Sequence, residues 1–276
     1  MLIDAHLRCE GSESPWNVLR KLDQADIDLA VLLAPMPPSN RPLADAAWPA
    51  NVNGWLARLV SHHRDRLAGL AVIDPRQPDA VAHVRYAIEA LELDGLALAA
   101  GAWSPREPRV TAVFAQADAL GVPVWCQTMA HPRELESLRT FPRLRLTLSR
   151  LGAPWCDEAL AVGLVDRLRG VAPEDALLRL ELSIAAPTFD SPAARGFGSP
   201  AARDRLAVVA KALATLGPRS IQFGSGLPLT ASATELRGAR RWVQDVFDEL
   251  DVSEDNRERV FAGTAGHWLM RDAVTR

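Results

Sequence analysis

The 276-residue sequence is poor in cysteine and has no long apolar run. Its three cysteines, Cys9, Cys126 and Cys156, are too scattered for a disulfide framework and form no CxxC pair, so we expect reduced thiols. The longest apolar stretches, such as 27–36, fall well short of the roughly 20 residues of a membrane-spanning helix. No basic segment followed by an apolar run comes after Met1. These absences predict no transmembrane helix, no signal peptide and a cytoplasmic protein.

The chain also lacks an excess of positive charge. Its 31 Lys and Arg face 34 Asp and Glu, for a net charge of -3, and no basic stripe stands out, which argues against nucleic-acid binding. No GxGxxG or GxxxxGK[ST] loop is present, so the sequence offers no dinucleotide or nucleotide phosphate site of those kinds. A composition of 48% hydrophobic and 24% charged residues is typical of a globular protein.

What the sequence has is an alternation of short apolar runs with longer segments of helical period. Eight such units follow one another, which predicts an α/β protein with a (β/α)8 TIM barrel of parallel strands; an open doubly wound sheet is the alternative. We expect one domain over residues 1–276, closed by a helical pair from Ser253 to Leu269. The expected strands are Leu2–Arg8, Asp28–Leu33, Leu67–Ile73, Gly95–Ala99, Val122–Thr128, Leu144–Leu151, Leu177–Ile184 and Ser220–Ser225.

Several strand ends carry recognisable motifs. Ile3-Asp4-Ala5-His6 opens the chain, and Pro123-Val124-Trp125-Cys126-Gln127 lies in the fifth strand. Ser149-Arg150-Leu151-Gly152 lies at the end of the sixth strand, and Gly224-Ser225-Gly226-Leu227-Pro228 at the end of the eighth. In order and spacing these motifs resemble the amidohydrolase superfamily, in particular its decarboxylase and lactonase branch. The resemblance runs nearly end to end. It implies a (β/α)8 barrel with a divalent metal, usually zinc, at the mouth.

The chain departs from the family pattern at most of the positions that the resemblance assigns to the metal. His6 matches the first histidine, but Arg8, Gln127 and Arg150 stand where further histidines are expected, and Gly226 replaces an aspartate. A guanidinium has no lone pair for a cation and adds a positive charge beside it. We therefore expect a degenerate metal site, with no metal and no other cofactor.

The same substitutions predict an anion site. On the family alignment, Arg8, Gln127 and Arg150 converge on the volume of the metal, and two guanidinium groups flanking an amide suit a carboxylate or phosphate. A small anionic molecule is the expected partner. In the alternative, the two arginines pair with Asp4 and Glu181 in a buried ionic network, and both arrangements stay open.

His6 is the candidate general acid or base, because imidazole titrates near neutral pH. The two-residue period of a strand predicts that Asp4, His6 and Arg8 share one face, with Asp4 assisting His6 in catalysis. The alternative is a structural histidine inside the barrel. Trp155 is expected to wall the ligand pocket.

Two functions fit this pattern. One is a metal-independent hydrolase or carboxy-lyase, acting by hydrolysis or decarboxylation on a small cyclic or aromatic carboxylate, with the arginines binding the acid group. The other is a catalytically inactive relative that binds an anionic ligand or a protein partner. Association into a homo-oligomer stays open, because barrels of this size often assemble.

Overall fold

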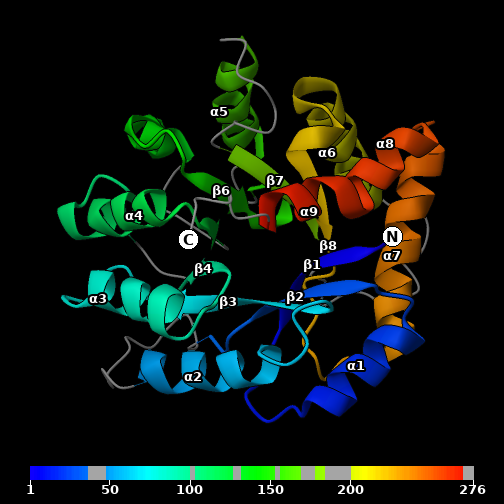
Figure 1. Cartoon of the computed structure of the whole chain (residues 1–276). Coiled ribbons are helices and arrows are strands. Elements are labelled where there is room, and N and C mark those ends of the chain that lie inside the picture. The colour runs from blue at the N-terminus through cyan, green and yellow to red at the C-terminus, as the bar shows by residue number, and fades with distance from the viewer. Residues whose placement is uncertain are drawn as a thin grey trace.

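Eight parallel strands form one sheet in the order β1 to β8, as expected for a TIM barrel (Figure 1). The computed structural model describes residues 1–36, 48–99, 103–126, 132–152, 156–168, 178–183 and 200–269. Each strand end lies within three residues of its predicted position, and β3 has the predicted bounds. They are β1 Ile3–Arg8, β2 Leu29–Leu33, β3 Leu67–Ile73, β4 Gly95–Leu98, β5 Pro123–Cys126, β6 Arg145–Leu148, β7 Leu178–Ser183 and β8 Ile221–Gly224.

The ring closes between β1 and the segment after β8. The amide of Arg8 donates to the carbonyl of Leu227 at 3.0 Å, and the amide of Leu229 donates to the carbonyl of Arg8 at 2.8 Å. The amide of Gly226 donates to the carbonyl of His6 at 2.9 Å. Backbone bonds of this kind satisfy the edges of the first and last strands, as closure into a barrel requires.

Helices surround the strand ring (Figure 1). Their ends follow local signals: Ser14 caps the first helix by accepting from the amide of Asn17, and Gly121 ends the fourth at a φ of 62°. The helical segments through the sixth β/α unit are α1 Pro15–Gln24, α2 Trp48–Val60, α3 Ala80–Arg85 with its continuation η1 Tyr86–Ala90, α4 Pro108–Leu120, η2 Pro132–Thr140, η3 Ser149–Gly152 and α5 Cys156–Leu168. They are followed by α6 Pro200–Leu216, η6 Pro218–Ser220 and α7 Ala233–Glu249.

The chain then returns to the barrel through α8 Glu254–Glu258, η7 Arg259–Gly263 and α9 Thr264–Leu269. Ser253 has the extended backbone of a cap, although its side chain makes no capping hydrogen bond. Thr264 donates from Oγ1 to the carbonyl of Pro218, which lies just before β8. Because η6 precedes β8, α9 lies at the amino ends of the strands, and its Trp268 is fully buried.

The interior of the barrel is divided between apolar and polar strands. One cluster of buried apolar side chains fills it from β1 to β5 and is completed by η7 and α9; its members are Ile3, Ala5, Val31, Leu33, Leu70, Ala97, Trp125, Ala262, Ala265 and Trp268. On β6 to β8, buried Thr147 pairs with Arg179, and buried Glu181 pairs with Gln222. Paired residues of parallel strands face the same side, so charged groups share the barrel with apolar ones.

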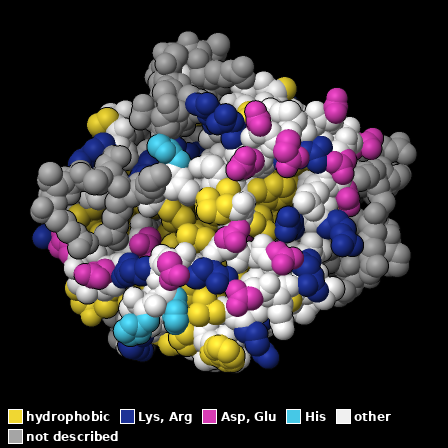
Figure 2. Space-filling model, turned by 45° about the vertical axis from the view of Figure 1, so that its right-hand side comes forward, with side chains coloured by type: hydrophobic (Ala, Val, Ile, Leu, Met, Phe, Trp, Pro, Cys, Tyr) yellow, Lys and Arg dark blue, Asp and Glu magenta, His cyan; other side chains and the backbone are white. Residues whose placement is uncertain are grey.

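The surface carries both signs of charge. On the face shown in Figure 2, Lys and Arg side chains are interspersed with Asp and Glu around an apolar centre. None of the helices in the described ranges is long and apolar enough to span a bilayer.

Candidate functional site

A register shift in β1 decides which side chains face the barrel interior. The pairing of β1 with β2 is interrupted between Asp4 and Leu7, where two residues, Ala5 and His6, lie opposite one residue of β2. Such a bulge reverses the alternation of faces. Asp4 therefore shares its face with Leu7, toward the surrounding helices, whereas Ala5 and His6 both turn inward. The expectation that Asp4 and His6 share a face is wrong for this reason.

Asp4 ties β1 to the end of β8. One of its carboxylate oxygens accepts from the amide of Ser225 at 2.8 Å and from the amide of His6 at 3.1 Å. Burial raises the pKa of Asp4 to about 6, against the hydrogen bonds from Ser225 and His6, which favour the ionised form. Asp4 bonds to the backbone amide of His6 and not to its imidazole, so a part for Asp4 in catalysis stays a prediction.

His6 pairs with a carboxylate that sequence analysis placed only in an ionic network. Its Nδ1 lies 2.9 Å from Oε1 of Glu181 on β7. Glu181 also accepts from the indole Nε1 of Trp125 at 2.6 Å and from Oγ of Ser149 at 3.3 Å. The imidazole and indole rings lie edge to face, with centroids 4.4 Å apart. Neither His6 nor Glu181 is more than 2% exposed.

This arrangement determines which nitrogen of His6 is available for chemistry. A carboxylate at Nδ1 favours the tautomer that donates there, which leaves Nε2 as the proton acceptor. Within the described part of the chain, Nε2 has no hydrogen-bond partner although it is buried. The pair can therefore take up a proton at Nε2, and the negative charge of Glu181 stabilises the resulting imidazolium.

Of the predicted substrate-binding residues, Arg8 and Arg150 lie at the carboxyl ends of their strands. Arg8 ends β1, is exposed, and donates from Nε to the carbonyl of Gly226 at 3.2 Å. Arg150 follows β6 with φ 52° and ψ 42°, and Leu151 after it has φ 54°. Left-handed backbone at two successive non-glycine residues costs roughly 1–3 kcal/mol each and is concentrated at functional sites. Gln127 and Trp155 fall outside the described residues.

The ionic-network alternative receives no support for Arg8, whose hydrogen bond goes to a carbonyl rather than to a carboxylate.

A different ion pair lies at the end of β3. Arg76 donates from Nε and from a terminal nitrogen to the two oxygens of Asp74, at 2.8 and 2.9 Å. Burial opposes ionisation of Asp74, but the hydrogen bonds from Arg76 outweigh it and hold its pKa below the usual value.

Two of the three thiols, those of Cys9 and Cys126, are buried. Cys126 is fully buried on β5 among side chains between strands and helices, and burial raises its pKa. Burial likewise raises the pKa of Cys9 well above its ordinary value. A thiol held in its neutral form is a poor nucleophile.

Glu181 is the functional residue that sequence analysis underrated, and the signal was present. The segment Leu178-Arg179-Leu180-Glu181-Leu182 alternates apolar and charged residues on a strand of a barrel whose outer face must be apolar. Such alternation places the charged residues in the interior, where a buried carboxylate requires donors. The donors themselves, Trp125 on β5 and Ser149 in η3, come from other elements and could not be paired with Glu181 from the sequence alone.

Together these features define the class of protein: a (β/α)8 barrel with a histidine–carboxylate pair inside and arginines at the carboxyl ends of its strands. An amidohydrolase family model matches residues 3–269. The chain belongs to this family. No curated protein sequence matches it.

Solved structures share the fold at low sequence identity. 2,6-Dihydroxybenzoate decarboxylase from Rhizobium has a TM-score of 0.65 at 12% identity, covering 97% of this chain and 98% of its own. Dihydroxybenzoic acid decarboxylase from Polaromonas sp. JS666, with bound manganese and the inhibitor 2-nitroresorcinol, gives 0.63 at 15%, covering 97% and 96%. 5-Carboxyvanillate decarboxylase from Sphingomonas paucimobilis gives 0.60 at 17%, covering 91% and 81%.

Proposed function

We propose that this amidohydrolase-family barrel catalyses proton transfer on a small aromatic carboxylate at its mouth, in a decarboxylation or hydrolysis that does not use the family metal. The observation that carries the proposal is the buried His6, held at Nδ1 by Glu181 and without a hydrogen-bond partner at Nε2 among the residues described. A buried acceptor without a partner is costly, so its retention suits a group that meets its partner in the substrate.

The substrate class rests on two supports. Structures of the same fold include decarboxylases of dihydroxybenzoate and carboxyvanillate, both aromatic acids. In this chain, Arg8 and Arg150 lie at the carboxyl ends of β1 and β6, where barrel active sites are built. We assign the carboxylate of the substrate to these two guanidinium groups, its orientation to Gln127, and the wall of the pocket to Trp155.

His6 transfers a proton through Nε2 in both candidate reactions. In decarboxylation, protonated Nε2 gives its proton to the ring carbon that bears the carboxylate. The carbon–carbon bond breaks and CO2 leaves; His6 then takes a proton from water, and the hydroxide combines with the CO2 as bicarbonate. In hydrolysis, neutral Nε2 takes a proton from water as the water attacks the carbonyl, then returns it to the leaving group. Glu181 stabilises the imidazolium in either case.

The described donor groups around His6 are too few for the family metal. A transition-metal site of this type needs three or four imidazole, thiolate or carboxylate donors. His6 and Glu181 supply two, and no group of three or more His, Cys, Asp or Glu that could hold a metal ion occurs in the described segments. Gly226, at the position of the family aspartate, has a φ of 68°, which favours glycine, and directs its carbonyl to Arg8. These residues do not fit the family metal.

The test is a screen of hydroxylated benzoates and their lactones or esters for turnover, before and after dialysis against a chelator. We expect turnover that survives the chelator and falls at least 100-fold in His6→Gln and in Arg150→Ala. Arg85→Gln, which changes an exposed arginine on α3, is the matched control. Full activity in both variants, or a stoichiometric transition metal in the active protein, contradicts the proposal. Saturable binding of every substrate without turnover favours the inactive relative instead.

A further inference from the structure

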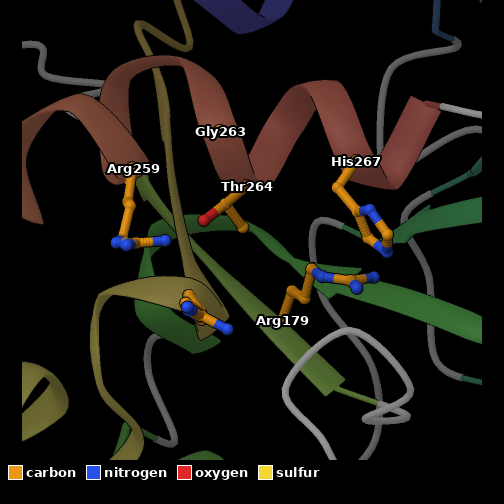
Figure 3. A pocket seen from close by; sticks show the side chains of 6 residues that line it. Arg179, Arg259, Gly263, Thr264 and His267 are labelled. Carbon is orange, nitrogen blue, oxygen red and sulfur yellow. The ribbon is translucent and has the colours of Figure 1, made fainter.

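A second cluster of cationic side chains lies at the opposite end of the barrel. It lines a cavity of about 340 Å3 beneath α9 (Figure 3). Arg179 comes from the first half of β7 and Arg219 from η6 before β8, so the cavity is at the amino ends of these strands. The other lining residues are Arg259, Gly263, Thr264 and His267, from η7 and α9.

Charge is the main property of this cavity. Three guanidinium groups and one imidazole line it, and none of its six lining residues in the described part of the chain is acidic. Arg179 is only 1% exposed, and a buried cation is costly unless charge or hydrogen bonds compensate it. Like charges around one space repel each other, and a bound anion converts that repulsion into attraction.

The arrangement favours phosphate over carboxylate. The three guanidinium groups come from three different elements, and Figure 3 shows Arg259 extending down from η7 and Arg179 extending from β7 toward His267, which lies above it. A phosphate has several terminal oxygens in a tetrahedral array and can accept from planar forks on several sides, whereas a carboxylate has two oxygens in one plane. The volume lies at the lower end of the range for small-ligand sites.

We propose that this cavity, built from Arg179, Arg219, Arg259 and His267, is a binding site for a phosphate group, either inorganic phosphate or a small phosphomonoester. It is distinct from the site at the mouth and does not depend on the function proposed there. A bound phosphate would hold α9 and η7 against β7 and β8. The site therefore also predicts a ligand-dependent gain in the stability of the fold.

The experiment titrates the full chain with inorganic phosphate and with phenyl phosphate by calorimetry, at ionic strength held constant with chloride. We expect saturable binding, weakened at least 10-fold in Arg259→Gln, and a rise in Tm with phosphate that this variant loses. Arg259 is the preferred target because it is partly exposed, whereas Arg179 and Arg219 also have interactions within the protein. Arg85→Gln serves as the control for a change of net charge.

Tighter binding of phenyl phosphate than of phosphate identifies a phosphomonoester as the ligand; the reverse order identifies the free ion. Should Arg259→Gln fail to fold, the exposed Arg219→Gln replaces it. The proposal is overturned if neither ligand binds saturably, or if the variants bind as tightly as wild type.

Discussion

At the scale of single residues, Glu181 controls the candidate active site, because its carboxylate accepts from His6, Trp125 and Ser149 at once. Glu181→Gln preserves the shape but removes the charge and lets an amide face Nδ1, which favours the wrong tautomer. We expect kcat to fall about 100-fold or more with little change in KM. The measurement is steady-state kinetics, with Glu181→Asp as a partial rescue. An unchanged kcat in Glu181→Gln would show that the pair is structural.

Gly224 packs so closely against His6 and Glu181 that it leaves no room for a larger side chain. A Cβ built there would lie 2.9 Å from Cβ of His6 and 3.0 Å from the carboxyl carbon of Glu181. Gly224→Ala should therefore displace the pair, lowering kcat and destabilising the fold by about 1–3 kcal/mol. Gly238→Ala, where a Cβ meets nothing within 4 Å, is the control and should be neutral or stabilising. Equal activity in both variants would contradict this packing.

The buried carboxyl group of Asp4 should make the free energy of unfolding depend on pH. Its folded pKa of about 6 exceeds the ordinary 3.8, so the folded chain binds this proton more tightly than the unfolded chain does. Protonation of Asp4 therefore stabilises the folded state. This stabilisation is fully present below pH 3.8 and is lost as pH rises through 6. The difference corresponds to about 3 kcal/mol. Asp4→Asn cannot ionise, so its unfolding free energy relative to wild type should rise by about that amount between pH 4 and pH 7.5. Denaturant titrations measure this difference, and a constant value would refute the raised pKa.

At the scale of elements, α9 completes the barrel core. Its Trp268 is fully buried in the interior cluster, and its Thr264 is bonded to the carbonyl before β8. Trp268→Ala should cost about 3–5 kcal/mol, because it removes a large side chain from a closed core. Trp16→Ala on α1, where the side chain is 72% exposed, should cost less than about 0.5 kcal/mol. Thermal unfolding compares the two, and similar losses would mean that α9 does not close the barrel.

The bulge in β1 is the element that aims His6. Without it, regular alternation from Asp4 would also turn His6 toward the helices. Closure onto the segment after β8 holds the bulge, since the carbonyl of His6 accepts from Gly226 and the amide of His6 donates to Asp4. The conformation of β1 thus depends on a partner more than two hundred residues away.

At the scale of the whole molecule, the stability of the barrel rests on apolar packing and backbone closure. Dialysis against a chelator should therefore leave Tm unchanged within about 1 °C, and adding manganese or zinc should not raise it, because ligands stabilise only where they bind the folded state. Differential scanning calorimetry measures both. A large drop after chelation would mean that a metal holds the strands together.

The eight strands could be predicted closely because short apolar runs, turn residues and helical periods are local properties of the chain. His6, Arg8 and Arg150 could be selected because the strand-end motifs resemble those of the amidohydrolases. The pairing of His6 with Glu181 could not, since it joins residues 175 positions apart. The prediction that Asp4 shares a face with His6 was wrong because a single bulge reverses the alternation of faces, and the residue pattern gives no sign of that bulge.

The amino-acid order by itself determined the α/β repeat, the family resemblance and the presence of arginines at the carboxyl ends of the first and sixth strands, since each follows from residue identity and spacing. Only the tertiary structure decided that His6 faces Glu181 inside the barrel and that Arg179, Arg219 and Arg259 gather under α9. The reason is physical: an imidazole obtains its partner, and guanidinium groups a shared cavity, only when closure of the ring brings distant strands to one place.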